Sequence, residues 1–353
     1  MPTEQTAMGP GRINLIGDHT DYNQGLALPM AIDLGVTVTF APDGGDRLSV
    51  SSDAFDGGIS LPIPLDADAR ALGAMEPSWA RLVAAVAATT GVATGGRLHV
   101  TTTLPAGAGL SSSAALSVAL AEVFDGRGTA EEVARLGQRA EHLIGAPIGA
   151  MDPLVCAGAT TGHALLIDFS TLSSRPVAVP PDLDIVVAES GQRRTVASSA
   201  YAARVAECEA AAAVIGPLGL ARPSELTALA DPLLARRARH VVTECRRVLG
   251  FAAALEAHDF VAAGRLMAES HRSLALDFEV STPAVDRLVE RLESIPGVFG
   301  ARMTGAGFGG CVVALSRPDA VELGRLDRPA WRVHPSDGTV ARRVLPAPGD
   351  QRP

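Results

Sequence analysis

The sequence has few aromatic residues and few cysteines, and both shortages limit what the chain can be. Phe, Trp and Tyr together make up 4% of its 353 residues. The four cysteines, Cys156, Cys208, Cys245 and Cys311, lie far apart, with no CxxC motif and no Cys/His pairing. Zinc sites need clustered ligands, and disulfide frameworks belong to small secreted chains. We therefore expect buried or incidental thiols, and any bound metal must be held by oxygen atoms.

Excess positive charge and long apolar runs are also missing. The net charge is −9 and the sequence pI is near 5.4, whereas nucleic-acid-binding chains usually carry a basic surface. No apolar stretch approaches the roughly 20 residues that span a bilayer. Residues 1–8 lack the basic and then apolar order of a secretory signal. We expect a cytoplasmic protein without nucleic-acid or membrane partners, and a monomer is compatible with the sequence.

The length and the 47% hydrophobic content are sufficient for two cores. A Ser- and Pro-rich stretch at 170–181 predicts a boundary, with an N-terminal domain at 1–175 and a C-terminal domain at 176–353. Hydrophobic patterns predict both strands and helices in each half. Strands are expected at 26–40, 97–103, 163–168, 184–188, 301–303 and 311–315. Helices are expected at 79–88, 111–124, 130–144, 196–213, 233–255, 259–269 and 285–295.

The most informative stretch is the N-terminal run GPGRINLIGDHTDY, residues 9–22. It places one Arg, one His and two Asp within ten residues, beside apolar Ile and Leu. One interpretation is an N-terminal strand followed by an ordinary polar turn. The other is a small polar pocket at the end of a strand, with Asp and His converging on a ligand rich in hydroxyl groups.

A second motif, LPAGAGLSSSAA at residues 104–115, follows a predicted strand and begins a predicted helix. Glycines let backbone N–H groups approach an anion, the helix N-terminus is partly positive, and serine hydroxyls add donors or a metal ligand. No Lys follows the glycines, so this is not a Walker A loop, and it is not a GxGxxG motif either. A simple N-cap at Ser111 is the alternative. Three consecutive serines exceed what a cap requires, so the motif predicts a phosphate-binding loop.

Two carboxylates, Glu141 and Asp152, follow this loop eleven residues apart. Asp152 stands between Met151 and Pro153, a setting that suits a buried site. In a phosphoryl-transfer enzyme one carboxylate could hold Mg²⁺ and the other could accept a hydroxyl proton. A helix-surface Glu and a helix-capping Asp would give the same spacing. A last Gly-rich run at 305–310 indicates either close approach of the backbone to a nucleotide or a tight β turn.

Together these motifs resemble those of the GHMP small-molecule kinases, and the first run resembles the signature of the galactokinase family. The resemblance covers about residues 9–315. It implies an α/β (α+β) fold with a ribosomal-protein-S5-like N-terminal domain, a ferredoxin-like C-terminal domain and an active site in the cleft between them. The implied reaction is ATP-dependent phosphorylation of galactose at its anomeric hydroxyl, with Mg²⁺. Four further stretches agree with the family, at 162–168, 197–201, 237–244 and 270–274.

The resemblance also implies roles for single residues. Asp152 corresponds to the catalytic base, and Arg12 to the arginine that lies beside it and stabilises charge on the transferred phosphoryl group. The implied sugar contacts are Asp18, His19, Thr20, Asp21, Gly149 and Tyr201. The implied ATP loop comprises Gly107, Ala108, Gly109, Leu110, Ser111, Ser112 and Ser113. The implied Mg²⁺ ligands are Ser113 and Glu141.

Three features depart from the family. Asp18 stands where the family usually has Glu, Pro153 stands where it usually has Gln, and the interval from Glu141 to Asp152 looks one residue short. In the family the longer Glu reaches the C6 hydroxyl of the sugar, so Asp18 predicts relaxed selectivity at C6.

Two alternative functions remain at this stage. One is a kinase of the same fold for N-acetylgalactosamine, arabinose or fucose. The other is a sensor of galactose and ATP without turnover, against which Arg12, Asp152 and the intact loop count.

Overall fold

The computed structural model describes residues 3–146, 149–192 and 197–343. The strands are β1 Gln5–Asn14, β2 Leu26–Ala27, β3 Pro29–Pro42, β4 Arg47–Ser52, β5 Phe55–Pro62, β6 Gly96–Thr102, β7 His163–Asp168, β8 Ser173–Ala178, β9 Asp184–Glu189, β10 Val298–Thr304, β11 Cys311–Ser316, β12 Ala330–Val333 and β13 Val340–Arg343. The helices are α1 Ala69–Gly73, α2 Ala80–Thr90, α3 Ser112–Phe124, α4 Ala130–Leu143, α5 Met151–Gly158, α6 Ala197–Ile215, α7 Pro232–Glu256, α8 Phe260–Leu276 and α9 Pro283–Glu293. None of these described helices is both long enough and apolar enough to cross a membrane.

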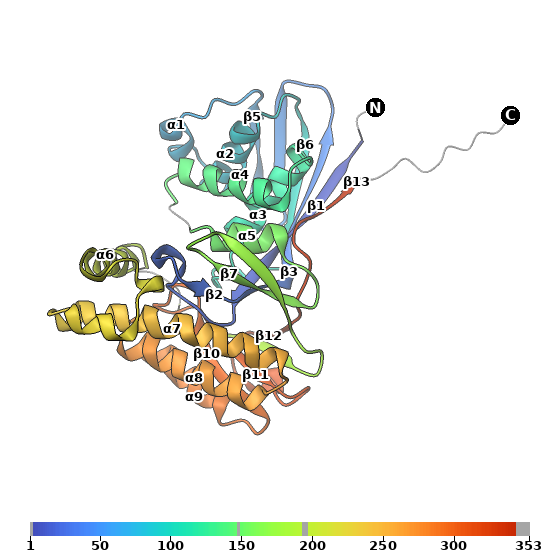
Figure 1. Cartoon of the computed structure of the whole chain (residues 1–353). Coiled ribbons are helices and arrows are strands. Elements are labelled where there is room, and N and C mark those ends of the chain that lie inside the picture. Colours follow the sequence, from blue (N-terminus) through green and yellow to red (C-terminus); the bar gives the residue numbers. More distant parts are fainter. Residues whose placement is uncertain (1–2, 147–148, 193–196, 344–353) are drawn as a thin grey trace.

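The first sheet forms the upper part of the molecule in Figure 1. Its strand order is β13-β1-β3-β6-β4-β5, and α3 packs across β1 and β3. α3 is built largely from Ala and Ser, whose small side chains allow a close approach. A Cβ atom at Gly9 of β1 would collide with the backbone of Ala115 in α3. This close contact sets the start of α3 beside the strand that carries Arg12.

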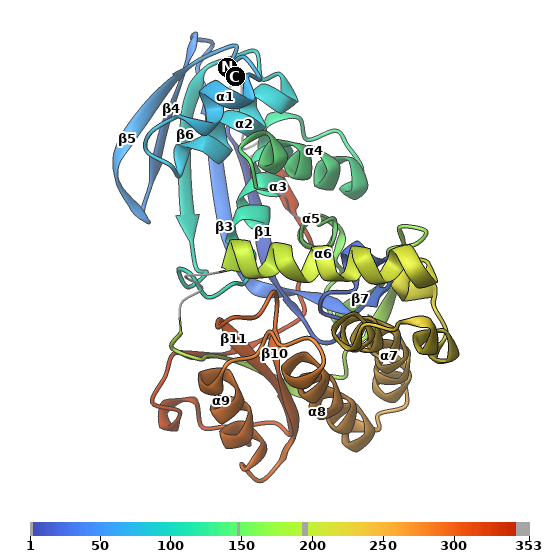
Figure 2. The same cartoon turned by 90° about the vertical axis from the view of Figure 1, so that its left-hand side faces the viewer.

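The second sheet lies in the lower part of the molecule, as Figure 2 also shows. Its order is β10-β11-β9-β12, all pairs are antiparallel, and α8 and α9 pack against β10. A three-stranded sheet, β2-β7-β8, lies between the two larger sheets and contacts α7. The turn that follows β1 thus lies where the upper and lower parts meet.

Most predicted elements are confirmed, and the α/β class with them. The expected helix at 111–124 is α3, and the expected strand at 163–168 is β7. The expected boundary at 175–176, however, falls inside β8, and β13 from the end of the described chain pairs with β1. The Ser- and Pro-rich stretch that suggested a linker is an edge strand, a place where Pro176 is tolerated. The division at 175–176 itself stays a prediction.

Candidate active site

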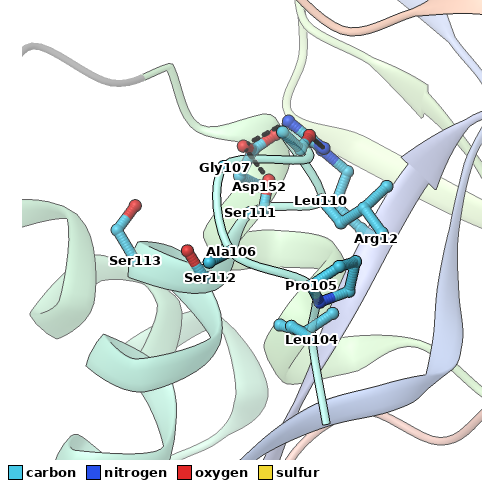
Figure 3. A pocket seen from close by; sticks show the side chains of 11 residues that line it. Arg12, Leu104, Pro105, Ala106, Gly107, Leu110, Ser111, Ser112, Ser113 and Asp152 are labelled. Carbon is cyan, nitrogen blue, oxygen red and sulfur yellow. Dashed lines mark hydrogen bonds and ion pairs between the residues drawn. The ribbon is translucent and has the colours of Figure 1, made fainter. Parts of the chain in front are cut away.

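The Gly/Ser-rich loop between β6 and α3 lines a pocket of about 490 Å³ together with Arg12 and Asp152 (Figure 3). Gly107 and Gly109 adopt φ angles of 76° and 78°, a conformation that glycine reaches without steric cost. α3 begins directly after the loop, at Ser112. The loop therefore turns out of the sheet and presents the start of a helix to the pocket.

The N-terminus of α3 has no side-chain cap, although Ser111 occupies the N-cap position. The Ser111 hydroxyl donates its hydrogen bond to Oδ2 of Asp152 instead. The first backbone N–H groups of a helix have no intrahelical partner, and they attract anions. The simple N-cap interpretation of Ser111 is therefore wrong, and the helix start is suited to a phosphate group.

Arg12 and Asp152 form a bidentate ion pair at one end of the pocket (Figure 3). Nε of Arg12 donates to Oδ1 of Asp152 over 2.7 Å, and Nη2 donates to Oδ2 over 2.6 Å. Nη1 of Arg12 donates to the carbonyl of Gly109 over 2.9 Å. This geometry fixes both side chains relative to the loop. The Asp152 side chain is still 23% exposed, so its carboxylate is rigidly held and accessible from the pocket.

Pro153 does not disturb the helix that carries Asp152. α5 begins at Met151, so Asp152 and Pro153 are its second and third residues. N–H groups in the first turn of a helix have no intrahelical acceptor, and a proline there removes no hydrogen bond. The departure at this position is therefore compatible with the predicted role of Asp152.

Glu141 and Ser113 face each other across α4 and α3. Glu141 is 1% exposed, and Ser113 is hydrogen-bonded to its carboxylate. Ser117 donates a second hydrogen bond to Oε1 over 3.3 Å. Burial raises the pKa of Glu141 to about 7, against the effect of the Ser113 hydrogen bond. Ser113 lines the pocket, and the buried Glu141 is its neighbour despite the short interval between Glu141 and Asp152.

The chain leaves β1 and makes a tight turn at residues 15–25, which we name the signature turn. His19 adopts a left-handed φ of 63° there. Its ring packs against Phe278 and Tyr201, with centroids 4.6 and 5.8 Å apart, and its Nδ1 lies 2.9 Å from the Tyr22 hydroxyl. The neighbouring Tyr22 and two rings from distant parts of the sequence therefore surround His19.

Asp21 and Gly149 also lie close to Asp152. Burial, together with the nearby Asp152 carboxylate, raises the pKa of Asp21 to about 6. A Cβ atom at Gly149 would collide with Oδ2 of Asp21, so backbone and carboxylate are in close contact. Tyr201 on α6 interacts with the charges of Asp21 and Asp152, and burial raises the pKa of its hydroxyl. The structure thus gathers these predicted sugar contacts around one carboxylate.

Two predicted site residues have partners within the protein. The Thr20 hydroxyl is hydrogen-bonded to the carbonyls of Gly17 and Leu26, at 2.9 and 2.8 Å. Ala108 does not line the pocket as the other loop residues do. It is buried, and its carbonyl accepts a hydrogen bond from the Cys311 thiol over 3.1 Å. Both residues shape the site rather than face its interior.

Asp18 also turns inward, and its main partner was not foreseen. Its side chain is 2% exposed, Oδ2 lies 2.5 Å from Nη2 of Arg302, and Oδ1 accepts from the Gly305 N–H over 3.0 Å. The signal for Arg302 in the sequence is a single arginine within an otherwise apolar strand. A guanidinium in such a place needs a buried acid, but the sequence does not say which one.

Comparisons with known proteins agree with this arrangement. Residues 79–159 match the model of the GHMP kinases N terminal domain, and residues 251–325 match that of the GHMP kinases C terminal. Residues 2–42 match the galactokinase galactose-binding signature. In this order, the three stretches contain the Gly/Ser loop, the last Gly-rich run at 305–310 and the signature turn.

Whole-chain relatives point to the same family. Human galactokinase is 43% identical over 332 residues, which is 90% of this chain and 85% of the human protein. Galactokinase of Mycobacterium tuberculosis H37Rv is 42% identical over 354 residues, covering 96% of this chain and 97% of that protein. The crystal structure of Lactococcus lactis galactokinase complexed with galactose superposes with a TM-score of 0.87 at 29% identity, covering 96% and 95% of the two chains. The chain therefore belongs to the galactokinase family of the GHMP kinases.

Proposed function

We propose that the chain transfers the γ-phosphoryl group of ATP to the anomeric hydroxyl of α-D-galactose, giving galactose 1-phosphate and ADP. The observation that carries this proposal is the ion pair between Arg12 and Asp152. The pair contacts the Gly/Ser loop through Gly109 and Ser111 and lies near Asp21. A carboxylate held next to both a phosphate-binding loop and a polar sugar pocket is what this reaction needs.

Asp152 would accept the proton of the anomeric hydroxyl. The hydroxyl oxygen forms a bond to the γ-phosphorus, the bond between that phosphorus and the bridging oxygen breaks, and ADP leaves with the electron pair. Arg12 orients the carboxylate and stabilises charge on the transferred group. Because such transition states are loose, correct placement of the hydroxyl contributes more than the basicity of Asp152.

The Gly/Ser loop, residues 107–113, is proposed to bind the phosphates of ATP. The chain contains no lysine at any position, so no lysine can act as the cation that a Walker A loop provides. Among the residues that the structure describes, the donors near the pocket include backbone N–H groups at the start of α3, the hydroxyls of Ser112 and Ser113, and the Arg12 guanidinium.

Ser113 and Glu141 are proposed to hold Mg²⁺. A hydroxyl and a carboxylate are hard oxygen donors, and Mg²⁺ typically takes one or two protein ligands together with substrate phosphates and water. Glu141 is buried, and within the described part of the chain its carboxylate forms no ion pair and has hydroxyl groups beside it. A bound cation would stabilise its charge. The bound ion would neutralise phosphate charge.

His19, Asp21, Gly149 and Tyr201 are proposed to contact galactose. They lie around Asp152. In the same order, they provide an imidazole ring, a carboxylate, main-chain polar groups and a phenol. Asp18 and Thr20 are proposed to act indirectly, by fixing the turn. A relative of 29% identity was crystallised in complex with galactose, which supports galactose as the ligand.

An ADP-release assay with a panel of sugars tests the proposal. Galactose is expected to give the highest kcat/KM, and glucose, N-acetylgalactosamine, arabinose and fucose much lower values. Faster turnover of another sugar would contradict galactose as the substrate. Galactose binding without any ADP release would indicate a sensor rather than an enzyme.

A further inference from the structure

A buried ion pair joins the signature turn to β10. Arg302 is fully buried and Asp18 is 2% exposed, and their closest atoms are 2.5 Å apart. Removing two charges from water is costly unless each finds several partners. Asp18 has a second partner in the Gly305 N–H, at 3.0 Å. Both oxygens of the Asp18 carboxylate therefore have partners inside the protein, at the point where the last Gly-rich run (residues 305–310) begins.

The same arginine also holds the backbone of the turn. Nη1 of Arg302 donates to the carbonyls of Asn14 and Leu15, at 3.3 and 3.1 Å. Next to it, the Thr304 hydroxyl accepts from the Asn14 N–H and donates to the Asn14 carbonyl, both at 3.0 Å. These backbone groups lie just where β1 ends, and buried backbone groups beyond a sheet still require partners. Two residues of β10 supply them.

α7 holds the next part of the turn. Oε1 of Glu244 accepts from the Gly17 N–H over 3.0 Å, and Ser270 donates to the same oxygen over 2.5 Å. Burial disfavours charge on Glu244, but the neighbouring charges and hydrogen bond together outweigh it, and its pKa falls to about 2. The largest of these contributions comes from Arg247, which is bonded to Oε2 at 2.7 Å. Nε2 of His240 lies 3.1 Å from the carbonyl of Asp18.

These contacts assign a structural role to the stretches at 237–244 and 270–274, which is to hold the signature turn. The chemistry of the pocket gives no role to these stretches. Between residues 14 and 18, backbone groups of four residues are held by buried side chains of the second half of the chain: those of Asn14, Leu15, Gly17 and Asp18. His19 follows immediately, in a left-handed conformation that a non-glycine residue keeps only where its surroundings fix it. Two residues further on is Asp21.

We propose that Arg302, supported by Glu244, is a positioning residue for galactose: it fixes the signature turn so that His19 and Asp21 face the sugar. The proposal rests on the proposed function, because it assigns these two side chains to galactose. Arg302 itself touches neither the phosphate loop nor Asp152 in the described contacts. Its loss should therefore weaken sugar binding and leave ATP binding intact.

The test is Arg302→Lys, which keeps the charge but cannot reproduce the fork of contacts to Asp18 and the two carbonyls. KM for galactose and for ATP, kcat, and the calorimetric Kd for galactose are measured on one preparation. We expect the galactose KM and Kd to rise about tenfold, with the ATP KM changed by less than about twofold. Arg332→Lys is the matched control. It makes the same exchange at an arginine that pairs with Asp184 in the same sheet, on β12 at the opposite edge, and should leave both KM values unchanged.

A merely structural role would reduce the fraction of active enzyme without this split between the two substrates. An unchanged galactose KM in folded Arg302→Lys overturns the proposal, and so does an equal rise in both KM values. If that variant does not fold, Thr304→Val decides by the same criteria. It replaces the hydroxyl group by a methyl group of similar volume. If wild-type protein releases no ADP with galactose, the proposed reaction fails, and the calorimetric Kd alone decides whether Arg302 positions the sugar site.

Discussion

Replacing Asp152 by Asn changes one atom at the centre of the candidate site. The carboxylate accepts hydrogen bonds from Nε and Nη2 of Arg12, at 2.7 and 2.6 Å, and from the Ser111 hydroxyl. Asn retains a single acceptor oxygen, and its NH2 group faces an N–H of Arg12 in either orientation of the amide, because Arg12 donates to both oxygens of the carboxylate. The variant keeps the shape of the side chain, but it removes the proton acceptor and places one donor against another.

The expected loss of turnover is at least about 100-fold, the lower end of general-base effects. This corresponds to at least about 2.7 kcal/mol of transition-state stabilisation. The buried Arg12 then keeps its hydrogen bond to the Gly109 carbonyl but loses its ionised partner. Breaking a fully buried ion pair costs about 3–5 kcal/mol, and the 23% exposure of Asp152 places this case below that range. The variant should fold with a lower melting temperature and still bind galactose.

ADP release, calorimetric galactose binding and thermal melting on the same preparation check these expectations. Asp33→Asn is a suitable control, because Asp33 pairs with His334 at an exposed site. It should match wild type in turnover. Near-normal turnover by folded Asp152→Asn would refute the assignment of Asp152 as the base and would leave it only the role of partner to Arg12.

Three further predictions concern the metal, the pH and the sugar. Glu141→Ala, and to a smaller extent Ser113→Ala, should raise the Mg²⁺ concentration required at saturating ATP, whereas Glu131→Ala on the exposed side of the same helix should not; a titration like wild type would place the ligand elsewhere. Burial raises the pKa of Asp21 to about 6, so its ionised form is lost as the pH falls through 6, and the galactose kcat/KM should fall with it; a flat profile from pH 5 to 7.5 would contradict a charged contact to the sugar. Because the Asp18 carboxylate is committed to Arg302, 6-deoxygalactose should be penalised far less than the roughly 10⁴-fold of a tightly bonded hydroxyl, and a kcat/KM penalty of that size would show that C6 is directly recognised.

Local elements could be predicted from the sequence because their causes are local. The run of small residues after the serines predicts α3, and the short apolar run within residues 163–168 predicts β7, each within one residue of its bounds. β13 could not be predicted in this way. It is a short strand whose place depends on pairing with β1 more than 300 positions earlier, and no local pattern encodes such a partner.

In the candidate site, too, local features could be predicted from the sequence and contacts between distant residues could not. A phosphate-binding role for residues 104–113 could be proposed from the sequence alone, because glycines and serines between a strand and a helix act through their own backbone. The pairing of Arg12 with Asp152, 140 residues apart, followed only from the resemblance, since spacing left Asp152 open as a helix cap. The role of Ser111 required the structure, because a hydroxyl at an N-cap position can bond its own helix or a distant carboxylate, and only the fold decides.

Asp18 shows why composition of a motif does not fix the direction of its side chains. The sequence gives no reason to treat Asp18 differently from Asp21, because the two carboxylates lie three residues apart in one polar turn. What separates them is a charge 284 residues away: Arg302 projects from β10 beneath the turn and draws one carboxylate inward, while Asp21 stays near Asp152. A short acid suits the inward position, because Oδ1 of Asp18 also reaches the Gly305 N–H at 3.0 Å. A longer side chain would have to fold back to make both contacts, so the Asp at this position is best explained by the ion pair beneath the turn.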